Sequence, residues 1–127
     1  MADNLPNIIE NQLLDALVGT TAYTVTTPIR LALVTANGSD SAAGTEVTGG
    51  SYARQTITFG AASSGQIANS GTVSFTGMPS CTVVGIEIYD SAGTPKRLAY
   101  GPLTNSRTVT AGDTVQFAAS SVTLSLS

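Results

Sequence analysis

Apolar residues recur at helical spacing at the start of the chain, whereas further on they alternate with polar residues. The first set lies one, three or four positions apart and comprises Leu5, Ile8, Ile9, Leu13, Ala16 and Leu17. Asp3 or Asn4 can cap a helix here, Pro6 suits a first turn, and Gly19 is a typical residue for its end. The pattern predicts one amphipathic helix over residues 5–18, whose apolar stripe must cover the chain's own sheet or a neighbouring subunit.

Beyond Gly19 the period is two, which is the period of a β-strand. About eight alternating runs are visible, marked by Ile29/Leu31/Leu33, Gln55/Ile57/Phe59, Val73/Phe75, Val84/Ile86/Ile88, Leu98/Tyr100, Val109, Val115/Phe117 and Val122/Leu124/Leu126. Turn sequences such as "DSAG" (90–93), "TGMPS" (76–80) and "AGD" (111–113) separate most of them. We predict an all-β fold for residues 23–127, either an antiparallel β-sandwich or a jelly roll, with a small barrel as the further alternative. No repeat or second domain is visible, so residues 1–127 are expected to form one domain.

The longest irregular segment, "ANGSDSAAGTEVTGG" (36–50), has the length of a functional or interface loop. Its glycines have a superficial phosphate-loop spacing, but Ser51 follows Gly50 where such a loop needs a lysine. Asp40 and Glu46 are too sparse for a strong calcium loop. We therefore predict a solvated loop that turns sharply into the next strand, with at least one glycine of the pair at positive φ.

Composition indicates a subunit of an assembly. Charged residues make up 10% of the chain, against about 25% in ordinary globular proteins, and the mean hydropathy is +0.21. Serine and threonine supply 33 of the 127 residues, so neutral hydroxyls rather than charges keep the surface wet. Part of the exterior is thus expected to be buried against partners.

The charge pattern argues against nucleic-acid partners. The formal net charge is −3, and of the five basic residues only Lys96 and Arg97 are adjacent. The one cysteine, Cys81, excludes an intrachain disulfide and is predicted to be a small buried residue at a strand start. No apolar run has the length of a membrane span, and no signal peptide is visible, so synthesis in a cytoplasm without a membrane partner is expected.

No catalytic centre, cofactor site or metal site is expected. The chain has no histidine, which removes Ser-His and Cys-His catalysis and histidine metal sites. The eight acids are spread along the sequence, so nothing favours the carboxylate pair of a glycoside hydrolase. We expect Glu87 on the solvent or interface side of a strand, and Asp90 and Asp113 as turn formers that accept backbone N–H groups.

Candidate interface residues come from the helix and from one arginine. The packing stripe of the helix is Leu5, Ile9, Leu13 and Leu17. Arg54 and Arg30 lie within predicted strands, where a guanidinium can bind a carboxylate in bidentate fashion or simply face solvent. For Arg54 the candidate partners are Glu87, Glu46 and a carboxylate of another subunit.

Several motifs in order resemble a family of small virion proteins of tailed bacteriophages, often described as tail fibre or minor structural proteins. They are "GTTAY", "IRLALVT", "TEVTGGSYARQTITFGAASSGQIANSGTVSF", "GIEIYDSAG" and "LAYGPLTNSRTVTAGDTVQFAASSVTLSLS", of which "GGSYARQ…FGAAS" and "AGDTVQFAA" are the most specific. The resemblance covers nearly the whole chain and implies a non-enzymatic β-sandwich that oligomerises on the virion. One departure is the absence of a bulky aromatic such as Trp before the "GI" strand.

Two locations in the virion follow from this resemblance. The favoured one is the phage head, where a homotrimeric decoration or cement protein would bridge major capsid protein subunits; the chain shows no heptads or repeats of a fibre shaft. The alternative is a tail-associated fibre or adaptor module that contacts the tail or a host receptor. There, Tyr23, Tyr52 or Tyr100 would serve as glycan stacking platforms, although burial in the core or an interface is the ordinary fate of a tyrosine.

Overall fold

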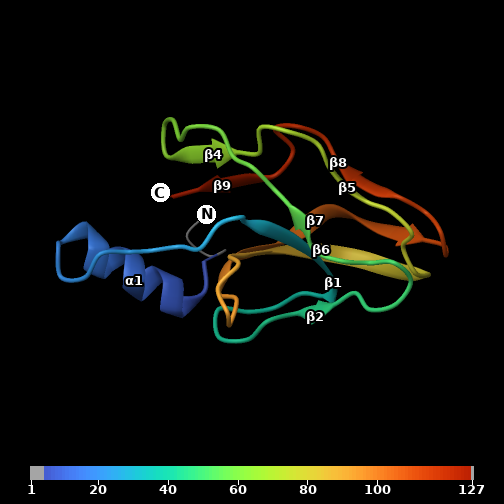
Figure 1. Ribbon diagram of the computed structural model, residues 1–127, viewed down its shortest axis with the longest axis horizontal. Helices are drawn as coiled ribbons and strands as arrows, with labels where there is room; N and C mark the ends of the chain where they lie inside the picture. Colours follow the sequence, from blue (N-terminus) through green and yellow to red (C-terminus); the bar gives the residue numbers. More distant parts are fainter. Residues whose placement is uncertain (1–4, 127) are drawn as a thin grey trace.

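A computed structural model describes residues 5–126, in which one helix precedes nine strands (Figure 1). The elements are α1 (Asn7–Leu17), β1 (Arg30–Ala36), β2 (Thr45–Glu46), β3 (Gln55–Thr56), β4 (Gln66–Ala68), β5 (Val73–Phe75), β6 (Cys81–Tyr89), β7 (Arg97–Val109), β8 (Val115–Phe117) and β9 (Thr123–Ser125). All the strand pairs are antiparallel. The predicted fold class, an antiparallel β-sandwich after an N-terminal helix, is confirmed.

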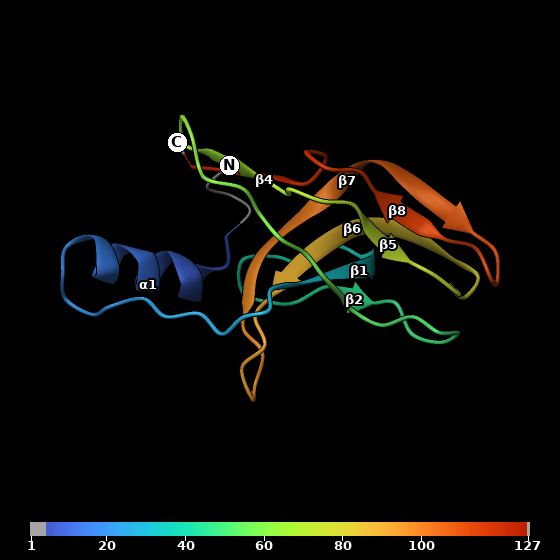
Figure 2. The same ribbon diagram turned by 45° about the horizontal axis from the view of Figure 1, so that its top comes forward.

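One layer of the sandwich is the sheet with strand order β2-β1-β6-β7, in which β3 also pairs with β1. The other layer is made of two short pairs, β4–β9 and β5–β8. Figure 2 shows β6 and β7 as long, curved strands that cross the molecule side by side. The core fills the space between the layers and includes Leu31, Leu33, Ile57, Val73, Phe75, Met78, Val83, Ile88, Val115 and Val122.

The strand boundaries differ from the prediction in three places. The alternation from Gln55 to Phe59 forms only the two-residue β3, and β2 and β4 were not predicted. The two runs predicted around Leu98 and Val109 belong to the single strand β7. Strand pairing decided these bounds, since alternation shows which face a residue occupies but not whether a partner strand lies beside it.

The centre of the large sheet is buried on both of its faces. Ala32 lies opposite Glu87 and Val34 opposite Gly85, and all four residues are buried although they lie on the face turned away from the core. The loop 37–44 covers this face: a Cβ atom on Gly85 would lie 1.9 Å from the side-chain oxygen of Asn37. The prediction that Glu87 faces solvent or an interface is wrong, because the chain's own loop covers it and leaves it 1% exposed.

The glycine pair before the Tyr52 segment has the predicted backbone role. Gly49 and Gly50 have φ values of 104° and 55°, a region in which residues with a Cβ are strained. A Cβ atom on Gly50 would also lie 2.6 Å from the carbonyl oxygen of Gly77. These glycines therefore let the chain turn sharply beside the 77–79 segment.

Helix α1 is shorter than predicted and begins differently. Pro6 is the N-terminal cap rather than a residue of the first turn, and its carbonyl accepts hydrogen bonds from the amides of Ile9 and Glu10 at 2.9 and 3.0 Å. Asp3 and Asn4, the predicted caps, lie outside the described residues. Gly19 ends the helix as predicted, with φ 79°, and the amide of Thr20 donates to the carbonyl of Asp15 at 2.9 Å.

Candidate assembly interface

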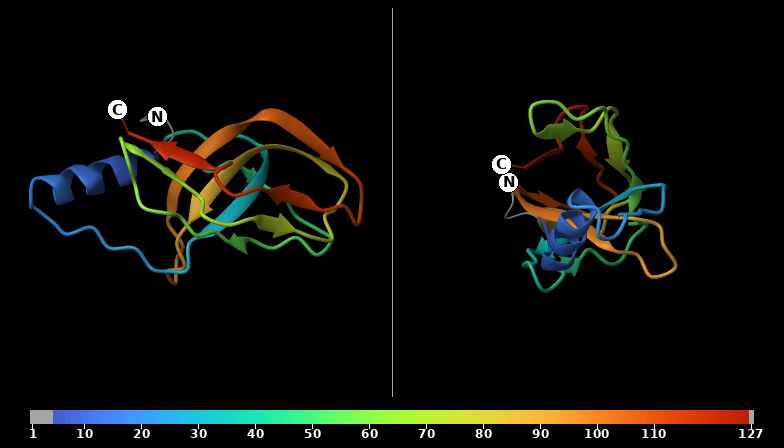
Figure 3. Two further views of the ribbon diagram at one scale, coloured as in Figure 1. Left: turned by 90° about the horizontal axis from the view of Figure 1, so that it is seen from above. Right: turned by 90° about the vertical axis from the view of Figure 1, so that its left-hand side faces the viewer.

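Helix α1 extends away from one end of the sandwich instead of lying across a sheet (Figure 3). Four large apolar residues on the helix and at its end are exposed: Ile8 by 60%, Leu14 by 60%, Leu17 by 79% and Val18 by 75%. Soluble monomers expose single apolar side chains routinely, but a group of them on one short element marks an interaction site. The exposed surface of α1 is therefore the first candidate interface.

The predicted stripe of the helix is divided between two environments. Ile9 is 2% exposed, Leu13 is half-buried, and Leu5 packs against the hydrophobic core. Leu17 is exposed and contributes nothing to the core. The amide of Asn7 donates to the carbonyl of Asp40 at 3.1 Å, so the loop 37–44 holds the start of the helix.

Sequence reasoning did not single out Leu14 and Val18 as interface residues. They lie on the side of α1 opposite Leu5 and Ile9, so the helix is apolar on more than one face. That two-sided distribution is the signal that could have identified them, since a helix covered by its own sheet alone needs only one apolar stripe.

Arg54 immediately precedes β3 and binds Glu46 on β2, one of its three predicted partners. Its Nε lies 3.0 Å from Glu46 Oε2 and its Nη2 lies 2.8 Å from Oε1. The guanidinium also lies 3.8 Å from the centre of the Tyr89 ring. Burial raises the pKa of Glu46, but hydrogen bonds from Arg54 and Tyr52 outweigh it, and the pKa is lowered overall.

Tyr52 connects this ion pair to the core. Its hydroxyl donates to Glu46 Oε2 at 2.7 Å and accepts the amide of Leu33 at 3.0 Å, while its ring stacks on Phe75. Burial is the largest cause of the raised pKa of Tyr52. Arg54 and Tyr52 thus bind groups of their own chain.

Glu87 is the centre of a second polar cluster. Its Oε2 accepts the amide of Gly44 at 2.7 Å and Arg97 Nη1 at 3.4 Å, and its Oε1 accepts the Tyr89 hydroxyl at 2.8 Å. Arg97 also donates to the carbonyl of Ser39. Burial and the hydrogen bond to Glu87 raise the pKa of Tyr89 to about 12. The cluster fixes the loop 37–44, and through that loop the start of α1.

The other residues discussed from the sequence have local roles. Asp90 accepts the amide of Lys96 at 2.7 Å, and Asp113 accepts the amide of Thr110 at 2.9 Å, which confirms both as turn formers. Cys81 begins β6 and packs partly buried against the core. Arg30 donates to the hydroxyl of Ser91 at 3.2 Å.

The other two tyrosines considered as stacking platforms are engaged within the chain. Tyr23 and Tyr100 are partly buried. The Tyr100 hydroxyl donates to Asp40, and Lys96 lies 5.1 Å from the centre of the Tyr23 ring. Neither ring is presented as a free flat surface.

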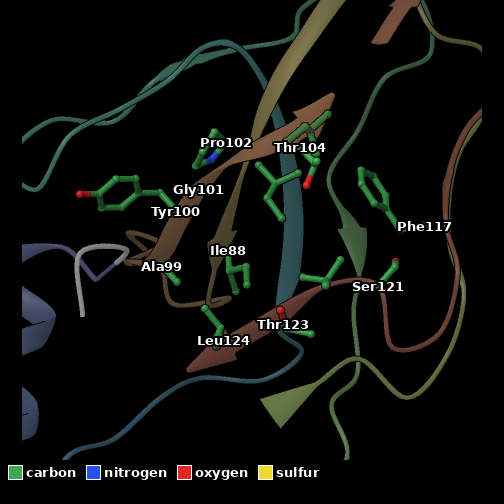
Figure 4. A pocket seen from close by; sticks show the side chains of 13 residues that line it. Ile88, Ala99, Tyr100, Gly101, Pro102, Thr104, Phe117, Ser121, Thr123 and Leu124 are labelled. Atoms are coloured by element: carbon green, nitrogen blue, oxygen red, sulfur yellow. The ribbon is translucent and has the colours of Figure 1, made fainter. Parts of the chain in front are cut away.

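The side of the sandwich between β7 and β9 is open (Figure 4). Among the described strands, β7 pairs only with β6 and β9 only with β4, so no strand pair joins the two layers here. The opening holds a cavity of about 500 Å³, lined on its apolar side by Ile86, Ile88, Leu103, Phe117 and Leu124. A neighbouring cavity of about 360 Å³ shares Leu103, Thr104, Phe117 and Ser121 with it and adds Arg107. We refer to the two cavities together as the β7–β9 groove.

Within residues 5–126, no group of three His, Cys, Asp or Glu side chains is close enough to hold a metal ion. The one helix in this range is too short to cross a membrane. The polar contacts described above are structural ion pairs and hydrogen bonds within the chain.

A β-sandwich with an exposed apolar helix and an open apolar side has the features of a structural protein that works in contact with other subunits. The sequence comparison identifies the class. A family model described as "Podophage GP4 fiber I protein gp80" matches residues 4–125, nearly the whole chain, and the chain belongs to this family of phage structural proteins. A search among curated proteins gives no match.

Proposed function

We propose that this protein is a non-enzymatic subunit that holds other components of the phage particle together, and that it attaches through helix α1. The observation that carries the proposal is the projection of α1 with Leu14, Leu17 and Val18 exposed. Leaving these side chains in water is unfavourable, and covering them in an assembly contributes about 25 cal/mol per Å² of buried apolar surface. Repetition of such a contact by symmetry supplies avidity from individually weak interfaces.

Two locations are consistent with this role. The sandwich with its projecting apolar helix supports a decoration or cement protein that bridges major capsid subunits of the head. The description of the family as a fibre protein supports the alternative, a tail-associated module. In either location a protein that binds only the assembled particle stabilises it by mass action.

Imaging of purified particles tests the proposal. Antibody against the chain, detected by electron microscopy, is expected to label either the head lattice or the tail. Particles that lack the chain would overturn the structural role. Label confined to the tail would remove the cement function, and label confined to the head would remove the fibre function.

A second experiment examines attachment. Particles grown without the chain are incubated with the purified wild-type protein or with Leu17→Asp, and bound protein is measured after sedimentation. Loss of binding for Leu17→Asp, with retention for Val25→Asp, is expected because Val25 is exposed but lies outside α1. Equal binding of both variants would exclude α1 as the attachment element.

A further inference from the structure

We propose that helix α1 of one copy docks into the β7–β9 groove of a second copy, so that the chain assembles head to tail. The inference rests on the proposed role as an assembly subunit and identifies the two surfaces that meet. Both surfaces are apolar, both are open in the described chain, and they carry opposite charges.

The outward face of α1 combines apolar side chains with one acid, Glu10. Glu10, Leu14 and Leu17 follow one another at intervals of four and three residues, which places them on one face of a helix. Asp15 is also exposed but lies on another face of the helix. The carboxylates of Glu10 and Asp15 have no hydrogen bond or ion pair among the described residues, and α1 has no basic residue in its last turn.

The groove provides the complementary charge. Arg107 is exposed at one end of it and lies 5.9 Å from the ring of Phe117, in contact with no carboxylate of the described chain. The other four basic residues each donate a hydrogen bond, to Ser91, Glu46, Thr24 and Glu87 respectively. No acidic residue in the described range lines either cavity. An acidic helix face with leucines therefore matches an apolar groove with one available cation.

The dimensions of the two surfaces agree. A helix of 11 residues is roughly 16 Å long. The groove follows β7 from Ala99 to Arg107, a stretch of roughly 25 Å in an extended strand. The groove is therefore long enough for the helix to lie along it with its apolar face inward, as in helix-in-groove recognition.

Two other self-contacts are less favourable. If α1 helices packed against each other about a symmetry axis, the contact would include Glu10 of both copies without a basic partner on the helix. If a strand were added to the outer edge of β7, Pro102 would interrupt the hydrogen bonds, since proline lacks an N–H group. The helix and the groove are different surfaces, so their contact is heterologous and forms either a closed ring or an open row. Because the proposed attachment to the particle needs a free α1, we expect an open row, in which the terminal copy keeps its helix free.

Mixing two defective variants tests this pairing. Leu17→Asp damages the helix, and Thr104→Glu with Arg107→Glu places two acids in the groove; all three positions are exposed, so the fold should persist. By sedimentation equilibrium each variant alone is expected to self-associate about tenfold or more weakly than the wild type. A 1:1 mixture is expected to form a heterodimer and stop there, because one intact helix meets one intact groove.

The control is Val25→Asp, which removes an exposed apolar residue outside both surfaces and is expected to assemble like the wild type. Thermal unfolding checks that each variant folds. If the double variant does not fold, Arg107→Ala replaces it, and we again expect weaker self-association than in the wild type.

Three results would overturn the inference: a wild-type chain that stays monomeric at its highest soluble concentration, a mixture that forms no heterodimer, or a groove variant that assembles normally while Leu17→Asp does not. The last result would point to helix–helix contact or to a different partner. Particle imaging separates this test from that of the proposed function. A chain found in particles that forms no heterodimer would overturn the docking alone, and a heterodimer from a chain absent from particles would overturn the virion role alone.

Discussion

Arg54 holds Glu46 with two hydrogen bonds from one guanidinium, through Nε to Oε2 at 3.0 Å and through Nη2 to Oε1 at 2.8 Å. The same guanidinium lies against the ring of Tyr89. The pair thus connects the segment before β3 to β2 and to the end of β6. A planar, bidentate donor is required for this arrangement, and lysine cannot replace it.

We expect Arg54→Lys to lower the free energy of unfolding by about 1 kcal/mol, because the bidentate geometry and the ring contact are lost while the charge stays. The side chains of both partners are about a quarter exposed, and water therefore limits the loss. Urea unfolding at neutral pH measures it. Arg30→Lys is the matched control, since Arg30 makes one exposed hydrogen bond and should change stability by less than about 0.5 kcal/mol. Equal effects at both positions would contradict the structural role of the Arg54 pair.

The free energy of unfolding should fall in acid, in part because Glu46 becomes protonated. Its pKa is lower in the folded chain than the ordinary value of 4.5, so the ionised carboxylate stabilises the fold above that value. This contribution is lost as the pH falls through the folded-state pKa. We expect Glu46→Gln to be less stable than the wild type near neutral pH, with the difference shrinking below about pH 4.5. Urea unfolding at a series of pH values measures both curves, and a constant difference at every pH would contradict the lowered pKa.

The local patterns of the sequence were sufficient for the fold class and for individual turns. Helical spacing from Leu5 to Leu17, period-two runs after Gly19 and the glycine pair at 49–50 reflect backbone constraints that act within a few residues. Asp90 and Asp113 were also predicted correctly, because a turn carboxylate binds amides close to it in the sequence.

Features that depend on distant segments could not be predicted in the same way. Glu87 was expected on an outer face because it alternates with Ile86 and Ile88, yet the loop 37–44 folds over that face. The small residues Ala32 and Gly85 carried a signal of this close approach, since glycine inside a strand often marks a place where another backbone lies near. The exposed side of α1 and the β7–β9 groove likewise became visible only when the separate segments were brought together.

Glu87 is expected to be the carboxylate on which the fold depends most. It is 1% exposed and binds Gly44, Tyr89 and Arg97. Glu87→Ala would leave the guanidinium of Arg97 largely buried without its counter-ion, and we expect a loss of about 3–5 kcal/mol in the free energy of unfolding, measured by urea unfolding.

The effect of Glu87→Ala should also be visible in the loop 37–44 itself. Because Gly44 loses its acceptor, limited proteolysis of Glu87→Ala under folding conditions should cut first within residues 37–44. Glu10→Ala is the control, because the Glu10 carboxylate has no partner among the described residues, and its cleavage pattern should match the wild type. Unchanged protection of the loop in Glu87→Ala would show that other contacts hold it.

Gly50 tests the backbone role of the glycine pair. A residue with a side chain would be strained at its φ of 55°. The turn is also crowded, since a Cβ atom would lie 2.6 Å from the Gly77 carbonyl oxygen. We expect Gly50→Ala to lower the free energy of unfolding by about 2 kcal/mol, mainly through strain in the folded chain. Gly93→Ala is the matched control, since a Cβ there meets no atom within 4 Å and its φ is not positive. Thermal and urea unfolding of the two variants measure the difference. Equal stability would mean that the 49–51 turn relaxes freely, and the sharp turn beside residues 77–79 would then not be required for folding.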